Sequence, residues 1–320
     1  MRELIDKAHE VRQESPRPHL GCSLLGHPCN RWLWLSFRWA VIEKFDGRIL
    51  RLFRRGQLEE NTVISDLRAI GLDVQNTLTN QSRVDFGGHV SGSIDGIIGE
   101  AILEIKTHSL KSFEDLEKNG VKKSKPMHWA QMQVYMFGSR LKFALYFAVC
   151  KNDDRIYTEE VALEQDKAEW FVDRAHDITL ADRMPEPLSG DPSWYECKYC
   201  HAHEFCFKSK LTQQINCRTC AHSTALSNST WRCERYDSDN IPYDWQLKGC
   251  DSHVLHPDLV PWKNKGGDDN NAVYIINGKK IINGENGYKS SELIANLDAC
   301  LSDDPNIAKV RNVFDARIIG

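Results

Sequence analysis

Three charged side chains in the segment SIDGIIGEAILEIKT, residues 93–107, have types and spacing that suit metal-assisted chemistry. Asp95 comes first, and Glu104 and Lys106 follow it two residues apart from each other. Side chains alternate between the two faces of a strand, so Glu104 and Lys106 share one face while Ile105 points to the other. The sequence therefore predicts a carboxylate and a lysine side by side on a buried strand.

Two glycines between these residues indicate a hairpin. Gly96 and Gly99 predict a turn between the strands SIDGII and AILEIK. This turn would set Asp95 beside Glu104, where two carboxylates repel each other unless a cation compensates. Hard oxygen ligands suit Mg²⁺ or Mn²⁺, whose bound water can become a nucleophile, and Lys106 could orient that water or stabilise a phosphate. The spacing alone leaves open an ordinary surface hairpin with a Glu–Lys pair.

The elements that would position these residues alternate between helices and strands. Strands are expected within 72–107, where the apolar residues are dense. Helices are expected at 1–14, 28–45, 54–71, 127–141 and 164–184, and a short helix or loop at 113–120. Two further strands are expected at 143–150 and 155–163. In the helix over 54–71, the apolar side is predicted to hold Leu58, Val63, Ile64 and Leu67. Beyond 262, we expect a linker at 264–271, an Asn-Gly hairpin at 272–287 and a serine-capped helix at 290–301.

Length and composition are those of an ordinary globular protein. The chain has 320 residues, which is enough for more than one domain, with 41% hydrophobic and 27% charged residues. No apolar run reaches membrane-spanning length, and the N-terminal segment lacks the apolar centre of a signal peptide. We therefore expect a cytoplasmic protein with no membrane association. The net charge of −4 does not by itself indicate a nucleic-acid-binding protein.

The order of these motifs resembles that of the PD-(D/E)XK nuclease superfamily, and within it the lambda-exonuclease-type and RecB-like nucleases. The resemblance covers about residues 20–210, with Asp95, Glu104 and Lys106 at the core motif. The segment RRGQLEE resembles the upstream helical motif, whose acid reaches the metal. Glu60 fits that spacing best, and Glu59 is the alternative.

A glutamine motif in AQMQVYM adds to the resemblance. Gln131 and Tyr135 lie one helical turn apart, so they share one helix face beside the active site that the resemblance implies. Gln133 matches the second glutamine of the lambda-type version. One departure is that Ser93 and Ile94 precede Asp95, where the family name implies a proline.

The resemblance implies an α/β fold, a PD-(D/E)XK core with a mixed central sheet flanked by helices, and a Mg²⁺- or Mn²⁺-dependent DNA exonuclease of phage recombination type. Asp95, Glu104 and Glu60 would bind the metal together with the carbonyl of Ile105. DNA would be the substrate, and a single-strand annealing recombination protein would be a partner. The alternatives are a DNA-binding or recombination-partner module built on a nuclease core, an endonuclease, and an end-trimming nuclease of CRISPR-adaptation type.

Two basic clusters flank the acidic hairpin in sequence. Such clusters are more often solvated faces than binding sites, but beside a nuclease site they would contact DNA phosphates without reading sequence. They are Arg48, Arg51, Arg54 and Arg55 in one stretch of eight residues, and Lys118, Lys122, Lys123 and Lys125 in another.

Eleven cysteines indicate metal ligands, because disulfides are rare in a reducing compartment. The segment CKYCHAHEFC has a C-x2-C-x5-C spacing. With one distant cysteine, this trio resembles the iron–sulfur staple of RecB-like nuclease domains, which implies a [4Fe–4S] cluster. Its four ligands would be Cys29, Cys197, Cys200 and Cys206. Cys22 competes with Cys29, and zinc bound by these thiolates or with His201 or His203 is the alternative.

A second set of cysteines follows in a segment that is poor in aliphatic residues. Its spacing fits a closed four-thiolate zinc site, which would supply the folding energy that a small core cannot. The ligands would be Cys217, Cys220, Cys233 and Cys250, with His222, His253 and His256 as substitutes, while Cys22, Cys150 and Cys300 are expected to be buried or unligated. We thus expect a nuclease domain over 1–210, a cysteine-rich zinc-type module over 211–262 and a small α+β hairpin-helix region over 268–320.

Overall fold

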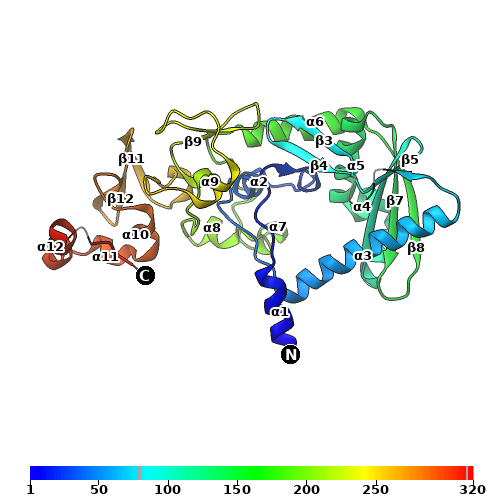
Figure 1. Cartoon of the computed structure of the whole chain (residues 1–320), viewed down its shortest axis with the longest axis horizontal. Coiled ribbons are helices and arrows are strands. Elements are labelled where there is room, and N and C mark those ends of the chain that lie inside the picture. The colour runs from blue at the N-terminus through cyan, green and yellow to red at the C-terminus, as the bar shows by residue number, and fades with distance from the viewer. Residues whose placement is uncertain (76, 78–80, 315, 320) are drawn as a thin grey trace. The chain divides into compact units, whose positions relative to one another are not determined.

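The computed structural model describes residues 1–75, 77, 81–314 and 316–319 (Figure 1). The chain forms two compact units, each made of two stretches. Unit 1 comprises residues 1–28 and 43–179, and unit 2 comprises residues 29–42 and 180–320. No helix in the described part of the chain is long and apolar enough to cross a membrane.

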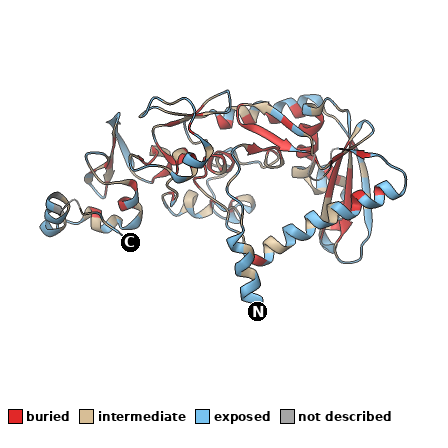
Figure 2. Cartoon of the chain, in the orientation of Figure 1, coloured by how far each residue is buried: buried red, intermediate tan, exposed pale blue. Residues whose placement is uncertain are grey.

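Unit 1 is built on a mixed five-stranded sheet, as the sequence predicted. Its order is β2-β5-β6-β7-β8, and β6 pairs antiparallel with β5 and parallel with β7. The strands are β2 (Val74–Gln75), β5 (Gly96–Ile98), β6 (Ala101–His108), β7 (Phe143–Cys150) and β8 (Ile156–Ala162). Strands β6 and β7 are buried over most of their length (Figure 2), which fits a central position covered by helices.

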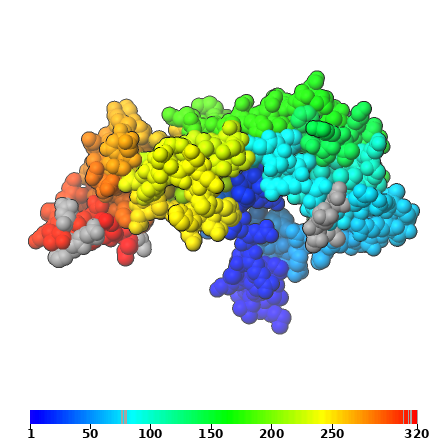
Figure 3. Space-filling view, turned by 45° about the horizontal axis from the view of Figure 1, so that its top comes forward, coloured from blue at the N-terminus to red at the C-terminus, as the bar shows by residue number. Residues whose placement is uncertain are grey.

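Five helices and a small second sheet complete unit 1. The helices are α1 (Arg2–Val11), α3 (Gly47–Ala69), α4 (Leu110–Ser124), α5 (Pro126–Ser139) and α6 (Gln165–Thr179). The second sheet has the order β1-β4-β3, with β1 (Leu20–Gly21), β3 (Arg83–Gly87) and β4 (Val90–Ser93). Helix α1 has no buried residue and stands out in the space-filling view (Figure 3). It contacts α3, whose N-cap Asp46 accepts a hydrogen bond from the Ile49 backbone N–H at 2.8 Å.

Helix α3 fixes its position by an apolar stripe near its C-terminal end. Val63, Ile64 and Leu67 pack with Leu103, Ile105 and other side chains of the sheet in one buried cluster. Leu58 was predicted on this stripe, but it is 58% exposed. The helix extends beyond the sheet at its N-terminal end, where the 3.6-residue pattern continues without an apolar surface to cover.

Unit 2 joins the tryptophan-rich helix α2 (Asn30–Phe37) to the cysteine-rich segment. Arg218, which is 1% exposed, lies 3.7 Å from the ring centroid of Trp39 and donates a hydrogen bond to the Phe37 carbonyl at 2.8 Å. Its Nε donates to Gln246 Oε1 at 3.0 Å. The aromatic residues of α2 are therefore core residues, and the buried Arg218 guanidinium lies against the rings of Phe37, Trp39 and Trp231.

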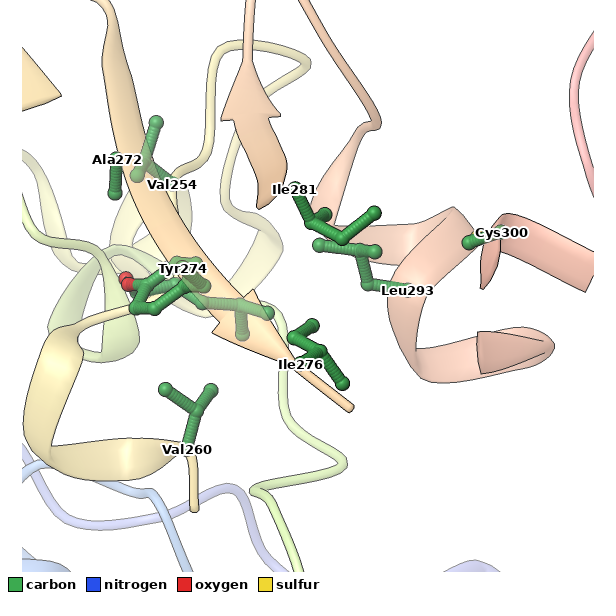
Figure 4. Close-up of a cluster of buried hydrophobic side chains, with 9 residues drawn as sticks. Val254, Val260, Ala272, Tyr274, Ile276, Ile281, Leu293 and Cys300 are labelled. Carbon is green, nitrogen blue, oxygen red and sulfur yellow. The ribbon is translucent and has the colours of Figure 1, made fainter. Parts of the chain in front are cut away.

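The rest of unit 2 consists of short elements. They are α7 (Tyr195–Lys198), α8 (His203–Phe207), β9 (Ser223–Ala225), β10 (Trp231–Cys233), α9 (Tyr243–Lys248), β11 (Lys263–Asp268), β12 (Asn271–Ile276), β13 (Lys279–Gly284), α10 (Ser290–Ala295), α11 (Leu297–Leu301) and α12 (Pro305–Phe314). The last three strands form an antiparallel sheet in sequence order. Its buried side chains and those of α10 form a separate core around Tyr274, Ile281 and Leu293 (Figure 4).

Three predictions for this C-terminal part can be checked. The Asn-Gly hairpin is confirmed, because Asn277 and Gly278 both have positive φ and join β12 to β13. The linker predicted at 264–271 is wrong, since most of it forms the exposed edge strand β11 and the start of β12. The serine cap is also wrong: Lys289 is the N-cap of α10, and the Ser290 hydroxyl donates instead to the His253 carbonyl at 2.8 Å.

Candidate active site

The β5–β6 hairpin brings Asp95 and Glu104 to the same place. Gly96 pairs with Leu103, so Asp95, one residue earlier, lies beside Glu104. Oδ2 of Asp95 accepts a hydrogen bond from the Ile105 backbone N–H at 3.0 Å. The hydrogen bond ties the carboxylate to the strand and fixes its direction without any ligand.

Glu104 and Lys106 form the centre of the site. Glu104 is fully buried, and its Oε2 accepts a hydrogen bond from Gln131 Nε2 at 3.2 Å. The Lys106 ammonium forms an ion pair with Glu104 Oε1 and lies 3.9 Å from Asp95 Oδ2 and 3.3 Å from the Ile105 carbonyl oxygen. One cation thus stands close to both carboxylates and to the backbone carbonyl that were proposed as metal ligands.

The electrostatics of these groups are strongly coupled. Burial raises the pKa of Glu104 to about 7, and the charges of Asp95 and Glu60 add to the rise while Lys106 opposes it. Burial alone would lower the pKa of Lys106, but the attraction of Glu104, Asp95 and Glu60 outweighs it and raises that pKa. A carboxylate with a raised pKa beside an ammonium is typical of functional sites in clefts.

Helix α3 contributes Glu60 to this cluster. Burial raises the pKa of Glu60, and the nearby Asp95 raises it further, against the effect of Lys106. Gln81 Nε2 donates to Glu60 Oε1 at 3.2 Å. Of the two acids proposed in this helix, Glu60 is therefore the one whose charge interacts with the hairpin, whereas Glu59 has no such interaction among the contacts of the described residues.

Helix α5 supplies Gln131 and Tyr135 on one buried face. Gln131 bonds both Glu104 and the Tyr135 hydroxyl, and burial together with the Glu104 charge raises the pKa of Tyr135. The Tyr135 ring packs so closely on β4 that a Cβ on Gly92 would lie 2.8 Å from it. Gln133 points elsewhere: its Nε2 donates to the Ala162 carbonyl at 3.0 Å and its Oε1 accepts from the Glu164 N–H at 2.6 Å.

A cavity of about 600 Å³ opens onto the site. Asp95, Lys106, Gln131 and Tyr135 line it, which makes these groups accessible to a ligand. The sequence did not indicate several other lining residues, because they come from separate segments of the chain and carry no local motif. They are Arg17, His19, Ser23, Gln81 and His128.

Behind His128 runs a chain of hydrogen bonds that the sequence did not indicate. The Tyr146 hydroxyl lies 2.8 Å from His128 Nδ1 and 2.8 Å from His108 Nε2, and Ser112 Oγ lies 3.3 Å from His108 Nδ1. Burial lowers the pKa of His128 to about 3 and that of His108 to about 4, with Lys106 and Lys125 adding to both shifts. Both imidazoles are therefore neutral at pH 7. No sequence motif marks this chain, because it depends on the pairing of β6 with β7, which sets Tyr146 opposite Glu104.

The donor set of this site fits Mg²⁺ or Mn²⁺. Asp95, Glu104 and Glu60 offer hard oxygen ligands, and Glu104 Oε1 is buried with no hydrogen bond of normal geometry in the described part of the chain. As they stand, however, no three His, Cys, Asp or Glu side chains among the described residues are arranged to hold a metal ion. Lys106 would have to withdraw from Glu104 before a divalent cation could be bound.

The two basic clusters are only partly free to contact a substrate. Arg51 forms an ion pair with Asp6, and Arg55 donates to the Lys151 carbonyl at 3.2 Å. Lys122 pairs with Glu164 at 2.5 Å, and Lys125 lies 3.7 Å from Asp115. The remaining members are exposed, namely Arg48, Arg54, Lys118 and Lys123.

The first cysteine set gathers in unit 2. The pKa of Cys200 is raised to about 11 by burial first, with smaller contributions from Cys29, Cys206 and Cys197, so the four thiols are electrostatic neighbours. Backbone N–H groups donate to two of the sulfurs at 3.4 Å, Trp32 to Cys29 and Ala202 to Cys200. Cys22 lies elsewhere, buried in unit 1 beside Gly92.

The proposed histidine substitutes in this region have other contacts. His201 stacks on Trp32 at 6.1 Å, and His203 Nε2 lies 3.2 Å from the Pro192 carbonyl.

The second cysteine set also gathers in unit 2. Burial raises the pKa of Cys217 to about 12, and Cys220, Cys250 and Cys233 add to the shift. Three of the four line one cavity of about 540 Å³. The Val254 N–H donates to Cys220 Sγ at 3.4 Å.

The histidines near the second set are partly committed to other bonds. His253 uses both ring nitrogens, one 3.1 Å from Thr219 Oγ1 and one 2.8 Å from Ser290 Oγ. His256 accepts from the Asp258 N–H at 3.1 Å. The three remaining cysteines of the chain, Cys22, Cys150 and Cys300, are buried as expected.

No protein-family model matches this chain, and no curated protein matches it. Among solved structures, it is similar to the alkaline exonuclease LHK-Exo from Laribacter hongkongensis in complex with dAMP, with 14% identity, a TM-score of 0.38, and coverage of 55% of this chain and 90% of that chain. It is similar to SSO0001 with 17% identity, a TM-score of 0.40 and coverage of 64% and 95%. It is also similar to a phage-related exonuclease from Haemophilus somnus 129PT, with 18% identity and a TM-score of 0.31. That match covers 38% of this chain and 67% of the exonuclease chain. At these TM-scores the likenesses carry no argument about activity, which must come from the site.

Proposed function

We propose that unit 1 is a metal-dependent deoxyribonuclease that hydrolyses phosphodiester bonds. The observation that carries the proposal is the cluster of Asp95, Glu104 and Lys106, in which Asp95 and Lys106 line an accessible cavity and the buried Glu104 pairs with Lys106. Three carboxylates and a lysine at one spot are costly for stability and useful for phosphate chemistry. A structural ion pair would not need the opening to the cavity.

Each residue has a role that its contacts support. Asp95, Glu104 and Glu60, with the Ile105 carbonyl, would hold Mg²⁺ or Mn²⁺. The bound ion would supply Lewis acidity and an activated water. Lys106 would orient the attacking water and stabilise charge on the phosphate, because its ammonium already lines the cavity. Gln131 holds Glu104 in place, and Tyr135 supports Gln131.

The finer proposal is an exonuclease of phage recombination type. It rests on the order of the sequence motifs, which resembles that of lambda-type nucleases. DNA ends would be the substrate, and a single-strand annealing recombination protein would be the partner that receives the product strand. The exposed basic residues of α3 and α4 would contact phosphates without reading sequence.

We further propose metals for the two cysteine sets of unit 2. Cys29, Cys197, Cys200 and Cys206 would hold a [4Fe–4S] cluster, and the second set would hold structural zinc. The mutual effects of the thiols on their pKa values support this pairing into two sets. Anaerobically purified protein should be brown and contain iron as well as zinc. A colourless preparation with about two zinc ions per chain would replace the cluster by a second zinc site.

The activity is tested with DNA labelled at its ends. Linear duplex and closed circular duplex are incubated with Mg²⁺, with Mn²⁺ and with excess chelator. Loss of linear DNA with the metals, and intact circles throughout, is the expected result. Cleavage of circles at a comparable rate would point to an endonuclease, and cleavage in chelator would overturn metal dependence. Binding of DNA without cleavage in any metal would favour a DNA-binding module.

A further inference from the structure

A second charged cavity, of about 550 Å³, lies in the C-terminal part of unit 2. Four cationic side chains line it, Arg235, Lys289, Arg311 and Arg317, against two carboxylates, Asp251 and Glu285. We call it the arginine pocket. The sequence predicted no function for residues 268–320, which form part of this pocket.

The hydrogen bonds of two arginines are incomplete inside this pocket. Arg235 contacts Glu285 Oε2 at 3.1 Å and donates to Asn270, while Arg311 contacts Glu292 Oε2 and the Gly287 carbonyl, both at 3.2 Å. Yet the Nε–H of each is buried and has no acceptor among the described residues. A buried donor without an acceptor costs free energy, and an anion in the pocket could remove that cost.

The carboxylates do not neutralise the pocket. Asp251 lies 3.5 Å from Lys289 but is 96% exposed, and Glu285 is 58% exposed. Exposed ion pairs are weak because water screens them. The buried Glu292 pairs with Arg311 at 3.2 Å, so three carboxylates lie beside four cationic side chains. One positive charge remains in excess, and a ligand with negative charge would be favoured over a neutral one.

The wall of the arginine pocket is closely packed. Its turn includes Gly284, with φ of +138°, and Gly287, and a Cβ on either would lie about 2 Å from a backbone oxygen: 2.2 Å from Asn270 O and 2.1 Å from Ile282 O. The Arg311 guanidinium lies 4.0 Å from the Tyr288 ring centroid, which holds its plane. Donors that are fixed in advance lose little entropy on binding.

We propose that the arginine pocket binds a phosphate of a nucleic-acid strand, at a place separate from the cavity of unit 1. Planar guanidinium groups with several fixed N–H donors match phosphate oxygens, and the pocket has too few apolar groups for an uncharged ligand. The choice of a strand over free phosphate rests on the proposed function, which makes DNA the substrate. The C-terminal region would then hold DNA while unit 1 cuts it.

The test measures binding of a fluorescent single-stranded oligonucleotide to the full chain in EDTA, which prevents cleavage, at several salt concentrations. Lys289→Gln and Arg317→Gln should each weaken binding several-fold and reduce the slope of log K against log salt by about 0.7, the value for one lost phosphate contact. Arg235→Lys should weaken binding with an unchanged slope, because it keeps the charge and loses the Nε–H. Lys280→Gln, an exposed change at the other end of the β12–β13 hairpin, should leave both unchanged.

Four outcomes decide the proposal. Unchanged affinity and slope in Lys289→Gln and Arg317→Gln would overturn it. Thermal stabilisation by inorganic phosphate that these variants lose, without any effect on oligonucleotide binding, would assign the pocket to free phosphate and also overturn it. Variant-sensitive binding in a protein that cleaves no DNA would support the pocket and remove the proposed function. Normal DNA cleavage, with binding that does not change in the variants, would overturn the pocket proposal and support the proposed function.

Discussion

The carboxylate cluster of unit 1 and the cysteine sets of unit 2 both gather in space, but different forces hold them. Asp95, Glu104 and Lys106 are held by strand register, a backbone N–H and a buried glutamine. The cysteines lie on turns, on short helices and at the end of strand β10, and backbone N–H groups donate to the sulfurs of Cys29, Cys200 and Cys220 at 3.4 Å. In neither region are described side chains arranged to hold a metal as they stand.

The difference concerns what each region would lose without the metal that is proposed for it. A sheet fixes side chains through its ladder, and Glu104 has Lys106 as its ion-pair partner, so we expect the unit 1 site to keep its form without a metal. The second cysteine segment shares its buried aliphatic side chains Val254, Leu255 and Val260 with the C-terminal sheet, and a metal bound there would add folding energy. We expect chemistry to depend on metal in unit 1 and stability to depend on metal in unit 2.

The largest effect should come from Lys106→Ala and Glu104→Gln. Each should lower the rate of DNA hydrolysis by about 10²- to 10³-fold or more, because each removes a charge from a preorganised site. The melting temperature should change little in Glu104→Gln, since the variant removes a buried charge. Glu59→Gln on α3 is the matched control and should keep its activity. Full activity of either site variant on the end-labelled duplex would show that Lys106 and Glu104 are not part of a nuclease active site.

Cys220→Ala tests whether a bound metal stabilises unit 2. It should lose zinc and destabilise unit 2 by several kcal/mol if the metal supplies folding energy. Cys300→Ala is the control: Cys300 is equally buried in the same unit but stands outside both sets, and it should retain metal. Metal analysis and thermal unfolding measure the two effects. Equal metal content in the two variants would contradict the zinc assignment.

The sequence predicted the strands and the hairpin because periodicity and turn glycines report local geometry, whereas the mixed sheet was implied by the resemblance to the nuclease superfamily. The side of the strand on which Glu104 and Lys106 lie follows from alternation alone, and the Asn277–Gly278 turn follows from its backbone preference. The His128–Tyr146–His108 chain could not be predicted, since it depends on which strand pairs with β6. The edge strand β11 was not predicted, because a glycine-rich exposed strand has the composition of a linker.

Two glutamines of α5 allow a finer test of the unit 1 site. Gln131→Ala should lower activity or metal affinity by about 10- to 100-fold, as expected for a partner that orients a metal-binding carboxylate. Gln133→Ala should reduce stability with little loss of rate, because Gln133 bonds the backbone at Ala162 and Glu164. Metal titrations at fixed substrate separate affinity from rate. Equal rate losses in both variants would mean that Gln131 acts only through folding.

The smallest effect is a difference in the pH dependence of stability between the units. In metal-free protein, the pKa of Glu104 is raised to about 7, above its value of about 4.3 in an unfolded chain. The folded state binds the proton more tightly between these values, so this contribution to the free energy of unfolding is present below pH 4.3 and is lost as pH rises to 7. The lowered pKa values of His108 and His128 change the stability in the opposite direction with pH. The contribution of Glu104 is therefore measured as the difference in free energy of unfolding between the native chain and Glu104→Gln.

His253 of unit 2 should show the opposite slope. Burial lowers its pKa to about 4, below the unfolded value of about 6.5, against the opposing effect of a backbone hydrogen bond. The unfolded state then binds more protons between pH 4 and 6.5, so stability is lost as pH falls through this window. Urea unfolding from pH 4 to 8, in EDTA, should therefore give a His253→Asn variant that is less stable at pH 7 and less sensitive to acid. A native chain and a His253→Asn variant with parallel pH profiles would show that the imidazole is not held neutral by its bonds to Thr219 and Ser290.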